Sequence, residues 1–149
     1  MLAIHWPQDL SGIVEISGSK NAALPLIACG LFFEKFTLHN VPRIGDVMTF
    51  LSIIESLWVK IDFVWNTLNM DSTAMSMENL DTELVKKIRV GIFLFPALLK
   101  RFRTLEIPYP GGCNIWKRPI DEHIRWFEAF GYKNEWSGDM IRFSGNYST

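Results

Sequence analysis

One short stretch, YPGGCNIWKRPIDEH at residues 109–123, gathers the side chains that could do chemistry. Cys113 follows two glycines, a lysine and Arg118 come next, and then His123. Cationic neighbours and a nearby helix N-terminus stabilise a thiolate, and the same groups bind phosphate. The stretch therefore predicts a reactive thiol beside an anion site. The residues alone leave equally open a turn without function, in which Arg118 and Asp121 are helix-start charges and His123 is solvated.

Lys20 and Asn21 offer a second position for an anion, because they stand just before an apolar run that is typical of a buried helix. That run contains the other cysteine, Cys29, which we expect to be a small core residue. Two cysteines are too few for a disulfide framework, and neither has the CxxC spacing of a metal site. We therefore expect two independent thiols and no metal.

Composition places these residues in one folded domain. The chain has 149 residues, of which 48% are apolar and 13% aromatic, enough to bury a core. Fifteen basic and sixteen acidic side chains give a net charge of −1, which argues against nucleic acid or an anionic membrane surface as partner. The sequence has no pattern of a secretory signal and no apolar run long enough to span a membrane. We expect a cytoplasmic protein.

The elements that must position the site follow from hydrophobic periodicity. Strands or hairpins are predicted at residues 12–17, 36–42, 60–72, 104–110 and 134–145. Helices are predicted at residues 21–33, 43–57, 76–102 and 120–131. The third helix is expected to be interrupted at Pro96, and the fourth to end on Gly131.

The helix at residues 43–57 has the clearest amphipathic pattern. Asp46 is well placed as its N-cap. Its apolar residues are spaced to form one buried face, and they are Val47, Phe50, Leu51, Ile54 and Leu57.

The order of elements contains a repeat. Arg43 and Asp46 before the second helix are echoed by Arg118 and Asp121 before the last one, a spacing of 75 residues from 43 to 118. Each unit is predicted to run strand, helix, strand, helix, strand, strand. The chain is therefore expected to be an α/β protein made of two similar units packed side by side, with the thiol loop inserted in the second.

Four segments in order also resemble a known family. ISGSKNAALPL, TLHNVPRIGDV, KIRVGIFLFPALLKRF and PGGCNIWKRPIDEH are similar to the signatures of the UDP-N-acetylglucosamine 1-carboxyvinyltransferases, the MurA-type enolpyruvyl transferases. The resemblance implies the inside-out α/β barrel fold with about two repeats present, at residues 20–85 and 86–149. Residues 1–19 would form a strand segment that packs on a second domain which this chain lacks.

The resemblance implies an activity as well. The family transfers the enolpyruvyl group of phosphoenolpyruvate to the 3'-hydroxyl of UDP-N-acetylglucosamine, the first committed step of peptidoglycan synthesis, and releases phosphate without metal or organic cofactor. The implied partners are these two substrates, and a second domain or chain that would complete the site.

Residue roles follow from the resemblance position by position. Cys113 matches the general acid that forms an adduct with phosphoenolpyruvate and is alkylated by fosfomycin. Lys20 and Arg118 would neutralise the substrate's phosphate and carboxylate, with Asn21 at the same site. Arg89 would reach the nucleotide-sugar and phosphoenolpyruvate side of the cleft. The implied cradle for uridine and diphosphate consists of Arg118, Pro119, Ile120, Asp121 and Glu122, with His123 beside it.

Departures from the family pattern support other interpretations. Trp58 stands where the family has a helix-terminal glycine, and we expect it to be strained there by about 1–2 kcal/mol. Trp116 and Lys117 replace small residues after the thiol. An alternative is a non-catalytic α/β module that keeps the fold and some anion or UDP-sugar binding. A third interpretation, 5-enolpyruvylshikimate-3-phosphate synthase, shares the fold but is not expected to carry the GGC loop.

Overall fold

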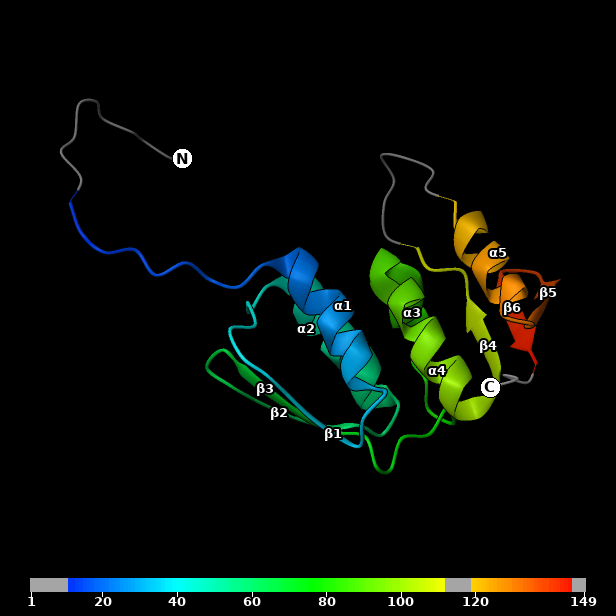
Figure 1. The fold of residues 1–149 in the computed structure, drawn as a ribbon, viewed down its shortest axis with the longest axis horizontal. Helices are drawn as coiled ribbons and strands as arrows, with labels where there is room; N and C mark the ends of the chain where they lie inside the picture. The colour runs from blue at the N-terminus through cyan, green and yellow to red at the C-terminus, as the bar shows by residue number, and fades with distance from the viewer. Residues whose placement is uncertain (1–10, 112–118, 146–149) are drawn as a thin grey trace.

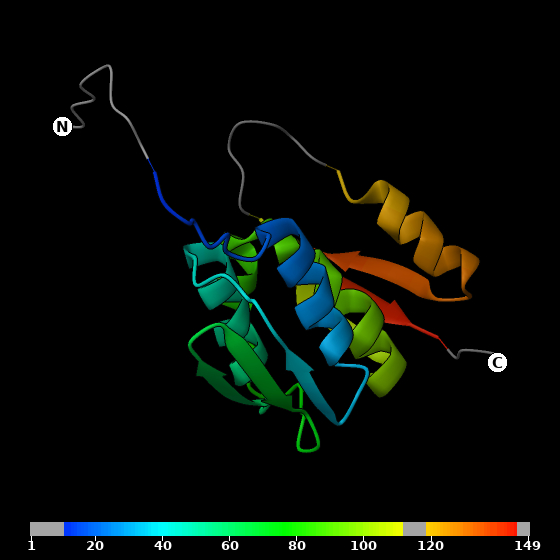
Figure 2. The same ribbon diagram turned by 60° about the vertical axis from the view of Figure 1, so that its left-hand side comes forward.

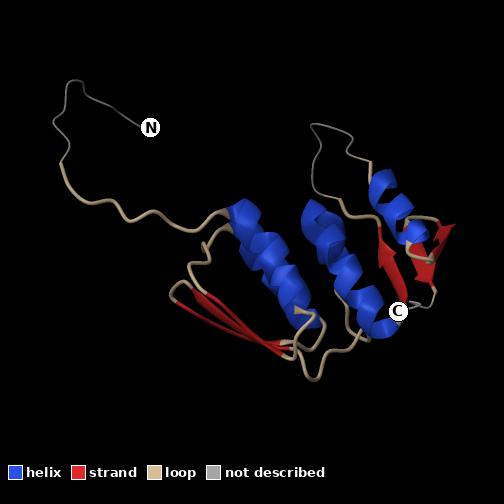
Figure 3. Cartoon of the chain, in the orientation of Figure 1, coloured by secondary structure: helices blue, strands red, loops and turns tan. Residues whose placement is uncertain are grey.

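The computed structural model describes residues 11–111 and 119–145. Within them the chain forms two units of the same design, each with its helices on one face of a three-stranded sheet (Figure 1 and Figure 3). Unit one, residues 20–71, contains α1 (Lys20–Gly30), β1 (Lys35–Leu38), α2 (Gly45–Ser56), β2 (Lys60–Val64) and β3 (Thr67–Asp71). Unit two, residues 82–144, contains α3 (Thr82–Lys87), the 3-10 helix η1 (Arg89–Phe93), α4 (Leu94–Phe102), β4 (Thr104–Pro108), α5 (Asp121–Ala129), β5 (Lys133–Ser137) and β6 (Met140–Ser144).

The two sheets have the same topology. Both are antiparallel, with strand orders β1-β3-β2 and β4-β6-β5, so that the last strand of each unit lies in the centre. Cross-strand pairs fix the register in unit one, where Thr37 donates a hydrogen bond to Asn69 over 2.9 Å and Leu38 faces Leu68. The predicted α/β class and its repeat are confirmed.

The core lies where the helices of the two units meet. α1 packs against α4 and η1, while α2 packs against α3 (Figure 2 shows α1 beside α4). All five residues of the predicted apolar face of α2 are buried, as are Phe95 and Leu98 on α4 and Phe143 on β6. The helix pattern therefore predicted the buried face of α2 correctly.

The strand predicted at residues 12–17 is not formed. This stretch is extended but has no strand partner among the described residues, and Ile13, Val14 and Ile16 are 97%, 85% and 87% exposed. Alternation indicates which side chains could share a face, but a strand needs a neighbour for its backbone hydrogen bonds. In the described chain each unit therefore begins with a helix.

Two helix predictions need correction. The N-cap of α2 is Ile44, and Asp46 lies inside the first turn. The long helix predicted at residues 76–102 is divided, because the backbone of Ile88 is extended (φ −128°, ψ 137°) between α3 and η1. Pro96 does not interrupt a helix, because it stands in the first turn of α4, where a missing N–H leaves no bond unmade.

The remaining local predictions concern two helix ends and a cysteine. Trp58 follows α2 with φ +65°, so its predicted left-handed conformation is confirmed. Gly131 has φ +88° at the equivalent place after α5, where the helix was expected to end. Cys29 was predicted to be buried and is exposed, because its side of α1 faces the space beside α5 and not the core.

Candidate functional site

The candidate site lies at one end of the molecule, where three helices begin. α1, α2 and α5 all start at the upper end in Figure 1, and β4 ends there before the thiol loop. The unpaired N–H groups at a helix start carry a partial positive charge and attract anions. The fold therefore places at one end of the molecule the starts of the helices whose flanking residues were predicted to bind an anionic substrate, with those of α1 and α2 in contact through Lys20 and Asp46.

Lys20 is the first residue of α1 and forms an ion pair with Asp46 in the first turn of α2. The two side chains are 45% and 49% exposed. Asn21 follows on the solvent side of the same turn and is exposed. The pair fixes the Lys20 ammonium between two helix starts, while leaving it open to solvent and hence to an incoming anion.

Arg43, the counterpart of Arg118 in the first repeat, makes its contacts within unit one. Its Nε donates to the carbonyl of Trp65 over 2.7 Å, its Nη2 donates to the carbonyl of Phe63, and its guanidinium lies 4.1 Å from the centre of the Phe63 ring. In unit one this arginine therefore closes the β2–β3 hairpin. The sequence repeat alone did not distinguish this role from anion binding.

Arg89 connects η1 to the segment that follows the thiol loop. Its Nη2 donates to the carbonyl oxygen of Pro119 over 2.9 Å, and its guanidinium lies 5.9 Å from the Tyr109 ring. Tyr109 precedes the loop and Pro119 follows it, so one arginine contacts both of its flanks. Of the predicted site residues, the structure thus brings Arg89 and Pro119 together.

The start of α5 holds the rest of the predicted cradle. Ile120 is buried and its carbonyl accepts from the N–H of Ile124 over 3.0 Å, which begins the helix. Asp121 and Glu122 are exposed in the first turn, and Glu122 forms an ion pair of 2.8 Å with Arg125. Acidic side chains suit a helix start, so Ile120 has a packing role while the two carboxylates face solvent.

His123 lies in a different environment. It lines an apolar groove between α1, α4 and α5, with its ring centre 5.7 Å from that of Trp126. Its Nδ1 is buried and has no hydrogen-bond partner in the described part of the chain. In the described part of the chain, no hydrogen bond or ring contact connects His123 with the Lys20–Asp46 pair or with Arg89.

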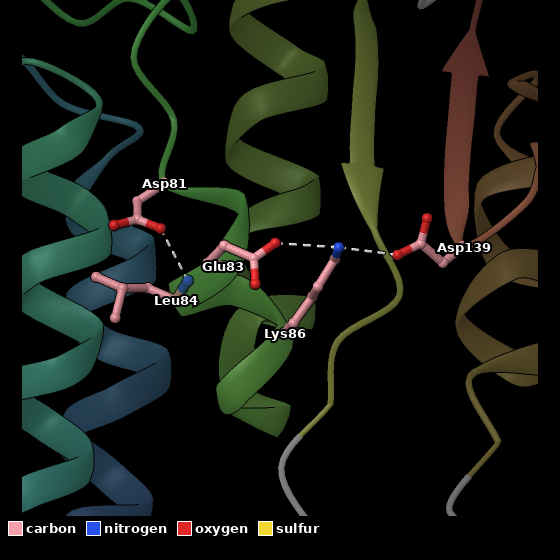
Figure 4. A network of polar contacts seen from close by, with 5 residues as sticks. All are labelled: Asp81, Glu83, Leu84, Lys86 and Asp139. Atoms are coloured by element: carbon pink, nitrogen blue, oxygen red, sulfur yellow. Dashed lines mark hydrogen bonds and ion pairs between the residues drawn. The ribbon is translucent and has the colours of Figure 1, made fainter.

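A polar network that the sequence analysis did not find supports the base of the thiol loop (Figure 4). The Lys86 ammonium lies 2.9 Å from Asp139 in the β5–β6 turn and 3.2 Å from Glu83, and Asp81 caps α3 by accepting from the N–H of Leu84. The Lys86 hydrogen bond lowers the pKa of Asp139, and the same bond, with a smaller contribution from Glu83, raises the pKa of Lys86. The network links α3 to the turn beside the end of β4.

Gly111 shows why the loop begins with glycine. A Cβ on this residue would lie 1.7 Å from the carbonyl oxygen of Lys86, a distance that no side chain tolerates. The backbone of Tyr109 is held nearby, since its N–H donates to the carbonyl of Asp139 over 2.8 Å. The glycine pair in the sequence was the available signal for this close approach.

Two predicted residues, Cys113 and Arg118, lie outside the described residues, as do Trp116 and Lys117. Their assigned roles stay predictions. In residues 11–111 and 119–145, no three His, Cys, Asp or Glu side chains form a group that could hold a metal ion. None of the described helices has the length and apolar character needed to cross a membrane.

Comparison with known proteins gives consistent results. The family model of EPSP synthase (3-phosphoshikimate 1-carboxyvinyltransferase) matches residues 4–142. The chain is 46% identical over 131 residues to a UDP-N-acetylglucosamine 1-carboxyvinyltransferase of Prochlorococcus marinus (strain MIT 9301), covering 87% of this chain and 29% of that protein. A protein of the same name from Acinetobacter baylyi is 40% identical over 123 residues, which cover 82% of this chain and 29% of that protein.

The fold has a solved counterpart. The crystal structure of the enolpyruvyl transferase NikO from Streptomyces tendae superposes with a TM-score of 0.77 at 20% identity, over 92% of this chain and 30% of that one. At this identity the likeness concerns the fold. The sequence and structure comparisons agree on how much of the relatives is matched: the chain spans less than a third of their length.

Proposed function

The chain belongs to the EPSP synthase family, and from this premise we propose that it carries part of a UDP-N-acetylglucosamine 1-carboxyvinyltransferase. The observation that carries the proposal is the 46% identity over 131 residues to a relative of that name. The reaction would join the enolpyruvyl carbon of phosphoenolpyruvate to a sugar hydroxyl of UDP-N-acetylglucosamine and release phosphate. This step would serve peptidoglycan synthesis in the cytoplasm.

In the proposed site the described residues bind and position anions. Lys20, held by Asp46, and the N–H groups at the start of α1 would meet the phosphate or carboxylate of phosphoenolpyruvate. Arg89 would hold the segment at Pro119 in place for the nucleotide sugar. The roles proposed for the other two residues rest on the motif: Cys113 would be the general acid, and Arg118 would be a cation that neutralises the charge of the substrate. Fixed cations matched to a transition state of several negative charges would do most of the catalysis.

The magnitude of one such contact can be bounded. A hydrogen bond to a charged group contributes about 1.5–3 kcal/mol. If the hydrogen bond stabilises only the transition state, its loss lowers the rate by about ten- to a hundredfold. Removal of the Lys20 ammonium in an assembled enzyme is expected in this range, while loss of Cys113 would affect acid catalysis more than folding.

Turnover would require more polypeptide than this chain. The described surface supplies cations from Lys20 and Arg89 at one side of a site, and the relatives are more than three times as long as the matched segment. We propose that a second domain or chain supplies the opposite side, including the base that accepts the proton of the sugar hydroxyl. The 149-residue chain would then supply part of one substrate-binding side.

A non-catalytic module is the second candidate. The strained Trp58 at φ +65° favours it, since this helix end has lost the residue that fits the conformation. 3-Phosphoshikimate 1-carboxyvinyltransferase activity, named in the description of the family model, is a third. The names of the curated relatives and the GGC sequence at residues 111–113 favour the UDP-N-acetylglucosamine enzyme over it.

The test is intact-mass spectrometry of the chain after fosfomycin, with and without UDP-N-acetylglucosamine. One adduct on Cys113, formed faster with the nucleotide sugar, is expected if the half-site is assembled. Because Cys29 is also exposed, peptide mapping must locate the adduct, and the Cys113→Ser variant is the matched control. Equal labelling of both cysteines, or no effect of the nucleotide sugar, would support the non-catalytic module.

A further inference from the structure

Tyr109, the residue after β4, contacts two side chains from other parts of unit two. The Arg89 guanidinium lies 5.9 Å from the centre of its ring, and the ring centre of Trp136 lies 6.1 Å away at an interplanar angle of 32°. Both distances are within the range of favourable contacts, for a cation near an aromatic ring and for two aromatic rings. Tyr109 therefore connects an indole on β5 with a cation on η1.

The backbone that carries the Tyr109 ring is fixed on both sides. The N–H of Tyr109 donates to the carbonyl of Asp139 over 2.8 Å. The Asp139 carboxylate pairs with Lys86 (Figure 4), and the carbonyl oxygen of Lys86 would lie 1.7 Å from a Cβ on Gly111. Residues 109–111 are thus held between the β5–β6 turn and α3, and a shift of the Tyr109 ring would break these contacts.

The Arg89 guanidinium is held by the Tyr109 ring and by one hydrogen bond. Its Nη2 donates to the carbonyl oxygen of Pro119 over 2.9 Å, which is the one hydrogen bond of this side chain within residues 11–111 and 119–145. A guanidinium has five N–H donors in a rigid plane. The other donors are therefore available to an oxyanion, and the ring contact limits rotation of the plane in which they lie.

Unit one contains a similar contact with a different outcome. The Arg43 guanidinium lies 4.1 Å from the centre of the Phe63 ring, but its Nε and Nη2 both donate to backbone carbonyls, those of Trp65 and Phe63. Arg43 is thus bound from two of its nitrogens to its own hairpin. The ring beside Arg89 holds a cation that keeps most of its donors for a ligand.

We propose that Tyr109 and Trp136 are positioning residues for Arg89, and that the two rings hold its guanidinium ready to bind a phosphate oxygen of the nucleotide sugar. Tyr109 acts through Arg89, and Trp136 acts through Tyr109. Fixing a long side chain before its ligand arrives reduces the entropy that is lost on binding. The choice of ligand rests on the proposed function, because Pro119, which Arg89 contacts, belongs to the predicted cradle for uridine and diphosphate.

Modification of Arg89 by phenylglyoxal, located by peptide mapping, tests the contact without any substrate. Tyr109→Leu removes the ring, and Arg89 should then react about two- to fivefold faster, the factor that corresponds to an exposed contact between a cation and a ring. Tyr109→Phe keeps the ring and should react like wild type. Trp136→Leu should give a smaller increase. The exposed Arg142 is the internal reference, and Trp65→Leu, at an 86% exposed tryptophan in the β2–β3 turn, is the matched control.

Affinity for UDP-N-acetylglucosamine, measured by isothermal titration calorimetry, distinguishes positioning from a merely structural role. Tyr109→Leu should weaken binding by about two- to fivefold, and Tyr109→Phe should restore it. Arg89→Met removes the cation and should weaken binding further. Adding Tyr109→Leu to Arg89→Met should then cause no additional loss, because the ring acts only through the guanidinium.

The two measurements fail in different ways. Equal modification rates of Arg89 in wild type and Tyr109→Leu, or additive losses of affinity in the double variant, would overturn the proposal. A wild-type chain that does not bind UDP-N-acetylglucosamine would contradict the proposed function, and the modification rates would still decide whether Tyr109 holds Arg89. Tyr109 and Trp136 are 37% and 49% exposed, so their variants should fold, and circular dichroism checks this.

Discussion

The two units share one topology and differ in what covers their second helix. In α2, five residues are buried, including Leu51 at 3% exposure. α5 has no buried residue. Trp126, which is equivalent to Leu51 by the 75-residue spacing of the repeat, is 62% exposed. α2 is covered by α3 of the following unit, whereas the same side of α5 borders the groove. The order of elements within a unit therefore fixes its fold, and its neighbours decide which side chains are buried.

The largest expected difference between the units is the cost of truncating these equivalent side chains. Leu51→Ala should lower the free energy of unfolding by about 2–5 kcal/mol, because it leaves a cavity in a packed core. Trp126→Ala should change it by less than about 0.5 kcal/mol, as is usual at exposed positions. Urea unfolding followed by circular dichroism measures both values. Similar costs at the two positions would show that α5 is covered in solution.

The next difference concerns the residues that end α2 and α5. Trp58→Gly should stabilise the protein by about 1 kcal/mol, because glycine adopts the left-handed conformation without the steric cost that a tryptophan bears. Gly131→Ala should destabilise it by a similar amount. A Cβ at Gly131 would meet nothing within 4 Å, so this cost is conformational. Thermal unfolding of both variants checks the opposite signs, and a loss of stability in Trp58→Gly would show that packing of the indole outweighs the strain.

The smallest difference lies in the two hairpin turns. The β2–β3 turn is held by Arg43, whereas the β5–β6 turn is held by the Asp139–Lys86 pair. Because Lys86 lowers the pKa of Asp139, the stability that this carboxylate contributes is present above its ordinary pKa of about 3.9 and is lost as pH falls through the lowered value.

Asp139→Asn tests this dependence. The variant should be slightly less stable than wild type at pH 7, and the difference should vanish at a pH below both pKa values. The raised pKa of Lys86 gives the opposite dependence: its contribution is present below about pH 10.5 and is lost as pH rises through the higher folded value. The urea concentration at the midpoint of unfolding, measured over a range of pH, tests both dependences. Asp62→Asn, on the exposed face of β2, is the control.

Sequence reasoning succeeded where a pattern is local and failed where a neighbour decides. Periodicity predicted the buried face of α2, and the repeat predicted two units of one design. Periodicity also predicted a strand at residues 12–17, which has no strand partner in the described chain. It predicted that Cys29 is buried, because a sequence pattern cannot show that one side of α1 stays uncovered. The division at Ile88 was missed because its apolar side chain fits a helical pattern whatever its backbone conformation.

The candidate site divides in the same way. Types and order of residues indicated anion binding at Lys20 and Asn21, and the structure adds Asp46 as the partner of Lys20. The network of Lys86 and Asp139 joins residues 53 positions apart (139 − 86), so only the folded chain brings them together. The roles of Cys113 and Arg118 rest on the motif and stay predictions.

The strand order has a consequence for how the chain is made. Because β3 lies between β1 and β2, and β6 between β4 and β5, neither sheet is complete until its last strand has left the ribosome. Unit one can close once Asp71 has emerged, while β4 and β5 wait without their central strand until residues 140–144 follow. Synthesis therefore proceeds through a stage in which a finished half carries an unfinished one, and during that stage the exposed strand edges of the second half are the surfaces that a chaperone would need to protect.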